Sequence, residues 1–179
     1  MSKKVLVIST SLRKNSNSER LAAAFASGAR EAGHETEEIS LSGKEINFCK
    51  GCLACQKTRR CVIRDDMDAI LPKMTAADVI ALATPIYYYE MSGQMKTLLD
   101  RGNPMFAGEY AFRDIYLLAA SAEDDPHTID KAVTGLSGWI ECFSEAKLSG
   151  ALLGGGVTGP GEIEGKEILA KAAEMGRGI

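Results

Sequence analysis

Four of the chain's five cysteines lie within thirteen consecutive residues. They are Cys49, Cys52, Cys55 and Cys61, spaced C-x2-C-x2-C-x5-C. Thiolates this close together could bind a metal ion or an iron–sulfur cluster, pair as disulfides, or carry thiol redox chemistry. A chain of 179 residues buries enough apolar surface to fold without such staples, so the fold itself does not require them.

A second segment with chemical potential runs from residue 9 to residue 20 and reads STSLRKNSNSER. It offers several hydroxyl groups and the charges of Arg13 and Lys14, directly before a helix that is expected to begin near residues 16–18. The first N–H groups of a helix are unpaired and favour anions, so this segment could hold a phosphate. Alternatively, it is an ordinary polar loop in which a Ser or an Asn caps the helix.

A third segment, residues 83–101, reads ATPIYYYEMSGQMKTLLDR. Pro85 stiffens the chain there, and three consecutive tyrosines, Tyr87, Tyr88 and Tyr89, cannot all point into one core. At least one ring is therefore expected at the surface, where it could stack on a planar ligand. The alternative is that the rings pack against neighbouring helices or against a second subunit.

The hydropathy pattern predicts five strands that alternate with five helices. The expected strands cover residues 4–9, 35–41, 78–84, 114–121 and 147–155. The expected helices cover residues 16–32, 67–77, 91–102, 128–145 and 165–179. Because the last three strands are apolar almost throughout, we expect helices on both faces of a parallel sheet. The pattern thus predicts a single α/β domain over residues 1–179, a three-layer doubly wound fold with a five-stranded parallel sheet in the order 2-1-3-4-5.

In a doubly wound sheet, ligands bind beyond the carboxyl ends of the strands, where the strand order reverses. That point lies between the first and third strands, so the hydroxyl-rich and tyrosine-bearing segments should meet there. Two other nucleotide signatures are disfavoured. No G-x-x-x-x-G-K-[ST] occurs, and the one G-x-G-x-x-G, at Gly154, Gly156 and Gly159, follows the last strand instead of the first.

Charge and hydropathy exclude several classes of partner. The formal net charge is −3 at pH 7, with acidic and basic residues mixed along the chain, which argues against nucleic-acid binding and a polybasic membrane anchor. No apolar run approaches the length of a membrane span or of a signal-peptide core. We therefore expect a cytoplasmic protein with reduced thiols that binds a small molecule or another protein.

The two ligand-facing segments together resemble a known family. STSLRKNSNS is similar to the phosphate loop, of the G-S-x-R-x-x-[GS]-N-[ST] type, of the flavodoxin-like NAD(P)H-dependent FMN reductases, with Thr10 in place of the usual Gly. TPIYYYEMSGQMKTLLDR is similar to their flavin-ring loop and the helix that follows it, and the resemblance extends over nearly the whole chain. It implies FMN as the cofactor. The cofactor-binding residues that it implies are Ser11, Arg13, Asn17 and Ser18 at the phosphate, Pro85, Ile86, Tyr87 and Tyr88 along the isoalloxazine ring, and Ser121 at the pyrimidine edge or ribityl chain.

The cysteine spacing, followed by the residues DDM, resembles the iron-sulfur flavoproteins, a branch of the same superfamily. In that branch the motif binds a [4Fe-4S] cluster, and its ligands here would be Cys49, Cys52, Cys55 and Cys61. Four thiolates in one short loop suit such a cluster better than structural zinc, which usually takes two separated pairs. Related FMN reductases keep a similar loop without a cluster, with the thiols as packing groups or subunit contacts, so both interpretations stay open.

The resemblance implies an enzyme in which FMN carries the chemistry and no acid or base side chain is demanded. We expect it to pass reducing equivalents from NAD(P)H through FMN to a quinone, a flavin or a similar acceptor, as a homodimer or homotetramer. With a [4Fe-4S] cluster, the protein would instead carry single electrons between the cluster, FMN and a ferredoxin-like partner. A third alternative is a non-catalytic redox sensor in which the cysteines switch between thiol and disulfide.

Two smaller features have structural interpretations. Asp65 and Asp66 precede an expected helix and are interpreted as a capping residue and a first-turn acid. Cys142 lies among apolar residues of the fourth expected helix and is interpreted as a small core residue.

Overall fold

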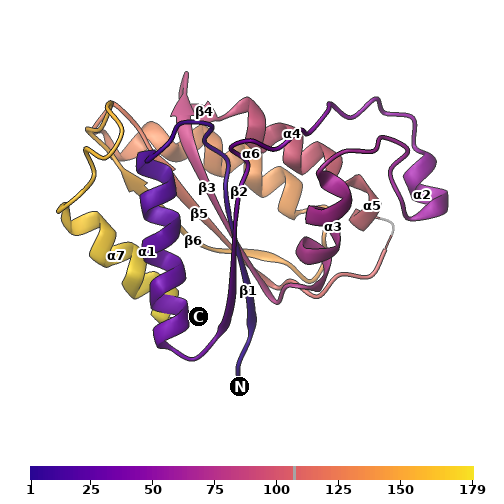
Figure 1. The fold of residues 1–179 in the computed structure, drawn as a ribbon, viewed down its shortest axis with the longest axis horizontal. Helices are drawn as coiled ribbons and strands as arrows, with labels where there is room; N and C mark the ends of the chain where they lie inside the picture. Colours follow the sequence, from indigo (N-terminus) through magenta and orange to yellow (C-terminus); the bar gives the residue numbers. More distant parts are fainter. Residues whose placement is uncertain (107) are drawn as a thin grey trace.

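In the computed structural model, which describes residues 1–106 and 108–179, a central β-sheet lies between two layers of helices (Figure 1). Five parallel strands form it in the order β2-β1-β3-β5-β6. They are β1 (Lys4–Ser9), β2 (Glu35–Ser40), β3 (Val79–Tyr87), β5 (Asp114–Ala120) and β6 (Lys147–Gly154). The order predicted for the five parallel strands is therefore confirmed.

A sixth strand, β4 (Glu90–Met91), pairs antiparallel with the end of β3, so the prediction of only five strands is wrong. Two residues are too few to show the period-2 alternation by which a strand is recognised. The strand exists because β3 continues as far as Tyr87, where the chain folds straight back on itself. The three tyrosines consequently lie in a hairpin at the end of β3.

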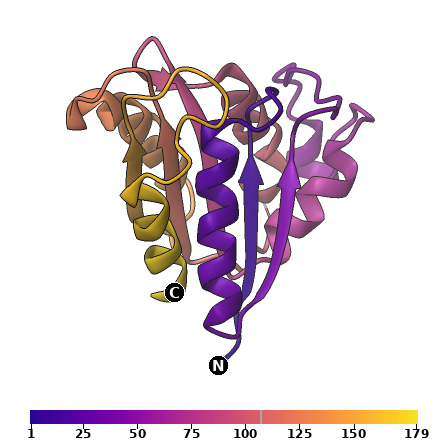
Figure 2. The same ribbon diagram turned by 60° about the vertical axis from the view of Figure 1, so that its left-hand side comes forward.

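Helices cover both faces of the sheet (Figure 1, Figure 2). α1 (Asn17–Glu31) and α7 (Glu167–Arg177) pack on one face, and α3 (Met67–Ala76), α4 (Gly93–Arg101) and α6 (Asp130–Ile140) pack on the other. The short helices that were not predicted are α2 (Ala54–Thr58), α5 (Asn103–Phe106) and the 3₁₀ turn η1 (Pro126–Ile129). Within the described residues, no helix combines the length and apolar character needed to cross a bilayer.

The side chains of each central strand divide between the two layers. In β1, Val5 and Val7 pack toward α1, whereas Leu6 and Ile8 pack toward α3 and α4. β6 departs from the prediction of burial on both faces, since only Gly154 of its eight residues is buried. The reason is that β6 is an edge strand, which the helices cover less completely.

α6 ends at Ile140, five residues earlier than predicted, and this changes the interpretation of Cys142. The next residues form a tight turn in which Phe143 donates its N–H to the carbonyl of Ile140 at 2.8 Å. The turn directs the ring of Phe143 into a buried aromatic cluster with Tyr110, Phe112 and Trp139. Cys142 points outward and is exposed, so its assignment to the core is wrong.

The helices α1 and α7 touch through their backbones. A Cβ atom at Gly28 would lie 1.9 Å from the carbonyl oxygen of Ala173, and one at Gly176 would lie 2.1 Å from that of Phe25. No side chain fits at either position unless the helices move apart. This contact holds α7 beside the N-terminal helix and so fixes where the loop before α7 can run.

Replacing Gly28 with Ala should lower the free energy of unfolding by about 1–3 kcal/mol, because the added methyl group forces the two helices apart. The matched control is Gly138→Ala in α6, where a Cβ atom meets nothing within 4 Å. That change should raise the free energy of unfolding by about 0.5–1 kcal/mol through helix propensity. Urea denaturation of both variants measures the difference, and equal stability of the two would contradict the packing argument.

Candidate functional site

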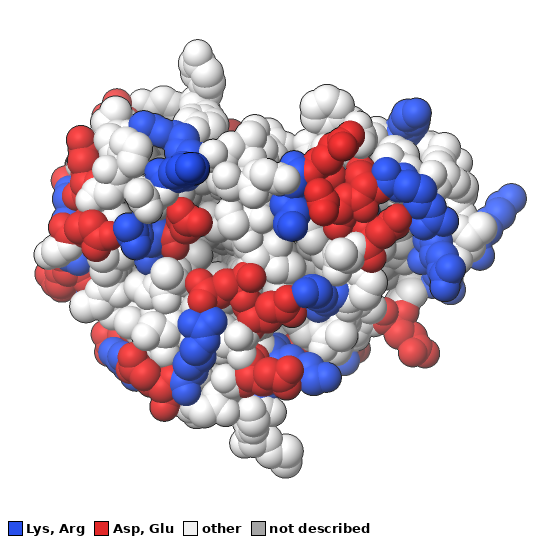
Figure 3. All heavy atoms as spheres, in the orientation of Figure 1, with Lys and Arg blue, Asp and Glu red and all other residues white. Residues whose placement is uncertain are grey.

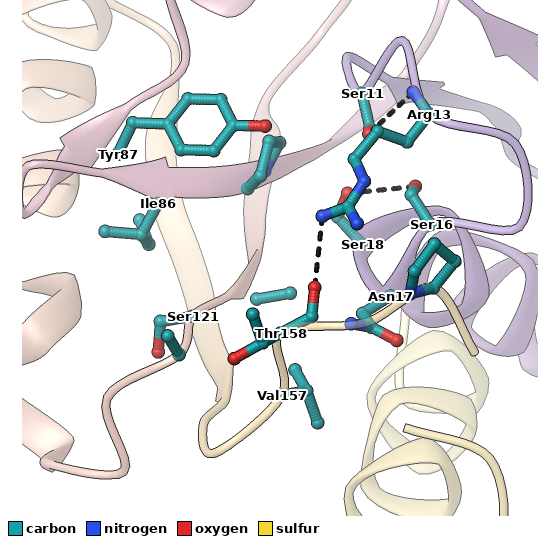
Figure 4. A pocket seen from close by; sticks show the side chains of 14 residues that line it. Ser11, Arg13, Ser16, Asn17, Ser18, Ile86, Tyr87, Ser121, Val157 and Thr158 are labelled. Atoms are coloured by element: carbon teal, nitrogen blue, oxygen red, sulfur yellow. Dashed lines mark hydrogen bonds between the residues drawn. The ribbon is translucent and has the colours of Figure 1, made fainter. Parts of the chain in front are cut away.

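A cavity opens at the carboxyl ends of β1, β3 and β5 (Figure 4). Strand pairing places it there, because Ser9 of β1 lies beside Ala83 of β3, and Pro85 of β3 lies beside Ala120 of β5. The lining residues are Ser11, Arg13, Ser16, Asn17, Ser18, Pro85, Ile86, Tyr87, Ala120, Ser121, Ala122, Val157, Thr158 and Pro160. Eight of the nine predicted cofactor-binding residues are among them, and Tyr88 is not.

One end of the cavity is built from hydroxyl groups around the start of α1. Ser16 is the N-cap of that helix, and its Oγ accepts a hydrogen bond from the N–H of Glu19 at 3.2 Å. The hydroxyl of Ser18 lies 3.4 Å from that of Ser16, and Ser11 Oγ accepts the N–H of Arg13 at 3.3 Å. Hydroxyls, a guanidinium group and a helix N-terminus in one place suit a phosphate group.

One wall of the cavity was not predicted. Val157, Thr158 and Pro160 belong to the glycine-rich loop 155–165, which leaves the edge strand β6 and folds back over the start of α1 (Figure 2). No local signal in the sequence marks this loop as part of the site, because it follows a strand remote from the point where the strand order reverses. Its place is set by the packing of α7 against α1.

Hydrogen bonds from the β1–α1 segment hold this loop. Arg13 Nη1 donates to the carbonyl oxygen of Thr158 at 3.0 Å, as Figure 4 shows. Asn17 Nδ2 donates to the carbonyl oxygen of Gly159 at 2.9 Å, and Asn17 Oδ1 accepts the N–H of Ile163 at 3.2 Å. Two of the predicted phosphate-binding residues are thus engaged with the loop.

A carboxylate closes the turn within the loop. Glu162 Oε2 accepts the N–H of Thr158 at 2.6 Å. Hydrogen bonds from the backbone N–H groups of Thr158 and Gly159 lower the pKa of Glu162 below its ordinary value. The ionised carboxylate therefore stabilises the turn that carries Thr158 into the cavity wall.

The other end of the cavity is formed by Pro85, Ile86 and Tyr87, where β3 runs past the rest of the sheet into its hairpin. At the tip of the hairpin, Tyr88 and Tyr89 have φ angles of 53° and 64°. Positive φ at both central residues is what a type I′ turn requires, and Asn or Gly usually occupies these positions. The turn points Tyr88 away from the cavity, and its side chain is 99% exposed.

Thr10, which stands where the resembling family has Gly, joins the two ligand-facing segments. Both its N–H and its hydroxyl donate to the carbonyl oxygen of Ala83 at 2.9 Å. The hydroxyl also lies 3.2 Å from the hydroxyl of Ser92, the N-cap of α4, whose N–H donates to Thr84 Oγ1 at 3.0 Å. The larger residue is therefore accommodated within a buried hydroxyl network.

Ser121 begins the loop after β5 and is nearly buried at the floor of the cavity. Its Oγ donates to the carbonyl oxygen of Glu123 at 2.6 Å. Its carbonyl oxygen accepts the N–H of Val157 at 2.9 Å, which ties this loop to the loop after β6. Ser121 therefore lines the same cavity as the other residues expected to bind the cofactor, and its contact with the cofactor stays a prediction.

The four clustered cysteines do not converge. Cys49 and Cys52 are exposed, Cys61 is half-buried, and Cys55 is buried with its Sγ accepting a hydrogen bond from Asn103 Nδ2 at 3.1 Å. Among the described residues, no three His, Cys, Asp or Glu side chains are grouped as a metal would require. Four thiols match an iron–sulfur cluster in number and kind, but this arrangement of them does not fit one.

The cysteine loop also departs from the even mixing of charge inferred for the chain. Residues 48–64 contain five basic residues and no acidic residue. Lys and Arg side chains accordingly line the end of the molecule that carries α2 (Figure 3).

A buried ion pair anchors both ends of the cysteine loop. Arg101 of α4 forms two hydrogen bonds with the carboxylate of Asp65, at 2.6 and 3.0 Å, and both side chains are at most 1% exposed. The same guanidinium donates to the carbonyl oxygens of Asn47 at 2.8 Å and Ile63 at 3.3 Å. Asp65 Oδ1 also accepts the N–H of Met67, the first residue of α3, at 3.1 Å, so Asp65 caps the start of that helix, as interpreted, and in addition fixes the base of this loop. Asp66 occupies the N-cap position itself, but its side chain makes no capping hydrogen bond.

Burial alone would raise the pKa of Asp65, but hydrogen bonds from Arg101 and from the backbone N–H groups of Asn47 and Met67 lower it to about 2. The carboxylate is therefore ionised at neutral pH. The pair costs desolvation free energy that its hydrogen bonds must offset, so its clearest effect is to position the loop.

The family model for "NADPH-dependent FMN reductase" matches residues 3–167 of the chain. An iron-sulfur flavoprotein of Archaeoglobus fulgidus is 31% identical over 181 residues, which cover 98% of this chain and 78% of that protein. An iron-sulfur flavoprotein of Methanocaldococcus jannaschii is 44% identical over 105 residues, 59% of this chain. The matched part spans only 54% of the length of that second relative.

Solved structures share the fold. An NAD(P)H:quinone oxidoreductase from Methanothermobacter marburgensis superposes with a TM-score of 0.72 at 16% identity, over 99% of this chain and 98% of that one. A flavodoxin from the domain Archaea gives a TM-score of 0.59 at 14% identity, over 98% and 95% of the two chains. The architecture is thus flavodoxin-like.

Replacing Asp65 with Asn should lower the free energy of unfolding by about 3–5 kcal/mol, because Arg101 would remain buried without its counter-charge. The control is Asp68→Asn, which breaks the exposed Arg64–Asp68 pair, 3.3 Å apart, and should cost less than about 1 kcal/mol. Urea denaturation at neutral pH measures both. A similar loss of unfolding free energy in the two variants would show that removing the charge of Asp65 costs no more at the buried pair than at an exposed pair.

Replacing Tyr88 with Asn should raise the melting temperature by about 1–4 °C, because Asn adopts positive φ at lower cost than Tyr. Tyr88→Val removes the same exposed ring but puts a β-branched residue at that φ, and it should lower the melting temperature. Thermal unfolding followed by circular dichroism compares the two. If the two substitutions shift the melting temperature in the same direction, backbone strain in the hairpin is not the cause.

Proposed function

Since the chain belongs to the NADPH-dependent FMN reductase family, we propose that it is an FMN-dependent oxidoreductase whose cavity binds FMN and receives reducing equivalents from NAD(P)H. A quinone, a flavin or a similar small acceptor then takes them from the flavin. One observation carries this proposal: eight residues from three separate segments, each expected to touch FMN, line a single cavity.

The polar end of the cavity suits the phosphate. Ser11, Arg13, Asn17 and Ser18 gather around the N-terminus of α1, where the first backbone N–H groups have no partner within the helix. A phosphate dianion there would receive hydrogen bonds from hydroxyls and from the guanidinium group, with the helix dipole favouring its charge.

The opposite end suits the flavin ring. Pro85, Ile86 and Tyr87 form a wall on the extended part of β3, against which a flat ring could lie. Ser121, at the floor of the cavity, could hydrogen-bond to the polar edge of that ring. When bound, FMN would supply the hydride chemistry. The chain's own part is to orient the ring and to shield one of its faces, since the described residues of the lining include no Asp, Glu, His, Cys or Lys side chain that could exchange a proton near neutral pH.

The test is an anaerobic titration of the FMN-loaded protein with NADPH or NADH, followed by visible absorbance. One equivalent should bleach one bound flavin, and a quinone added afterwards should restore the colour. Arg13→Ala should weaken FMN binding by about 10- to 100-fold, because a hydrogen bond to a charged group is lost. A flavin whose absorbance NAD(P)H leaves unchanged would refute the proposal.

A second candidate function is that of an iron-sulfur flavoprotein, which would carry single electrons between a [4Fe-4S] cluster, FMN and a ferredoxin-like protein. The names of several relatives and the four-cysteine loop support it. The separation of the thiols counts against it.

Iron and acid-labile sulfide, assayed on the same anaerobically purified sample, decide between the two functions. Four irons per flavin would favour the iron-sulfur flavoprotein, and flavin without iron would favour the reductase. Tight FMN binding without turnover of any acceptor would instead favour the thiol-based redox sensor.

A further inference from the structure

The loop 155–165 forms a wall of the cavity, and apart from the turn that Glu162 closes it is irregular backbone. Glycines are frequent in it, and Gly156, Gly161 and Gly165 all adopt positive φ. Such a segment loses much conformational entropy when it is ordered. Its position therefore depends on contacts made from outside the loop.

Most of these outside contacts are at the surface. Arg20 pairs with Glu164 at 2.8 Å, but the two side chains are 42% and 54% exposed. Lys166 Nζ donates to the carbonyl oxygen of Gly156 at 3.2 Å, also at the surface. Exposed contacts of this kind contribute little to the free energy that holds the loop in place.

Two contacts to the loop are buried: the N–H of Val157 donates to the carbonyl oxygen of Ser121, and the side chain of Asn17 binds the loop from α1. Asn17 is on the first turn of α1, the residue is 8% exposed, and its amide binds the loop at two points. Nδ2 donates to the carbonyl oxygen of Gly159 and Oδ1 accepts the N–H of Ile163, a residue with no exposed surface, so the amide joins two points of the loop that lie four positions apart. Losing it would leave the buried N–H of Ile163 without a partner.

The engaged amide differs from what a phosphate ligand needs. A phosphate dianion accepts hydrogen bonds, yet Oδ1 cannot donate and one of the two N–H groups of Nδ2 is directed at Gly159, so the loop takes two of the three groups that the amide offers and leaves a single N–H. Figure 4 shows Thr158 between Asn17 and Ser121, with its carbonyl oxygen turned toward Arg13, so the wall that the loop forms extends from the polar end toward Ser121.

We propose that Asn17 is a positioning residue that holds loop 155–165 in place as a wall for the unphosphorylated part of the flavin, and that it is not a ligand of the phosphate. The inference rests on the proposed binding of FMN. This arrangement has a consequence for ligand specificity. The wall would contact parts of the molecule that FMN and riboflavin share, whereas a residue that binds the phosphate would contribute to the affinity for FMN alone.

The test compares the dissociation constants of FMN and riboflavin, measured by quenching of flavin fluorescence. Asn17→Ala should weaken the binding of both flavins by a similar factor, about tenfold, because one buried and one half-buried hydrogen bond are lost. The matched control is Ser18→Ala, the next residue on the same helix turn, which makes no hydrogen bond to the loop. Ser18→Ala should weaken the binding of FMN and leave the binding of riboflavin unchanged. If Asn17→Ala weakens the binding of FMN alone, the proposal is overturned.

Hydrogen exchange of the flavin-free protein provides a second readout that does not depend on FMN. Amides of residues 155–165 should exchange faster in Asn17→Ala than in the parent protein, with exchange in β3 unchanged as the folding control. Asn17→Asp keeps an acceptor for the N–H of Ile163 and should retain part of the protection. Unchanged exchange of the loop in both variants would overturn the proposal. If the parent protein binds no flavin, the proposed function is refuted, but the exchange measurement still shows whether Asn17 holds the loop.

Discussion

The parallel pairing of β1 with β3, and of β3 with β5, is the constraint on which the site depends. Parallel strands end at the same edge of a sheet, so the segments after these three strands are forced together. Thr10 strengthens the junction because its N–H and hydroxyl both reach the carbonyl oxygen of Ala83. The hydroxyls of one segment and the apolar wall of the other are thereby brought to opposite ends of one cavity.

The walls of that cavity are made from less regular backbone than the sheet beneath them. Tyr88 and Tyr89 turn the hairpin with positive φ angles, and the loop 155–165 relies on glycines. Both elements are held by rigid neighbours, the hairpin by its continuity with β3 and the loop by Asn17 on α1. Such strained or flexible elements on a rigid scaffold are typical of ligand sites.

The cysteine loop is organised separately from the cavity. Its base is fixed by the buried pair of Arg101 and Asp65, while its thiols point to different environments. A buried pair with this desolvation cost is retained where it defines a conformation. The ion pair specifies where the loop starts and ends, and it leaves the path between those points to weaker contacts.

Local patterns in the sequence were enough to predict the five parallel strands, the five longer helices and the hydroxyl-rich segment that lines the polar end of the cavity. This is because hydropathy periods and the chemistry at the end of a strand involve residues that are close in the chain. Cys142 shows how such patterns fail, since an apolar neighbourhood does not say where a helix ends.

Tertiary structure decided the rest. Asn17 bonds to Gly159, 142 residues away, and Arg101 bonds to Asp65, 36 residues away. No pattern within either segment encodes these partners, because they meet only after α7 has packed on α1 and α4 on the sheet. The sequence by itself determined the kind of fold and the residue types that follow its first strand. Packing between distant elements determined which side chains line the cavity and which hold its walls, and, in the described part of the chain, it brings no three of the four clustered thiols together.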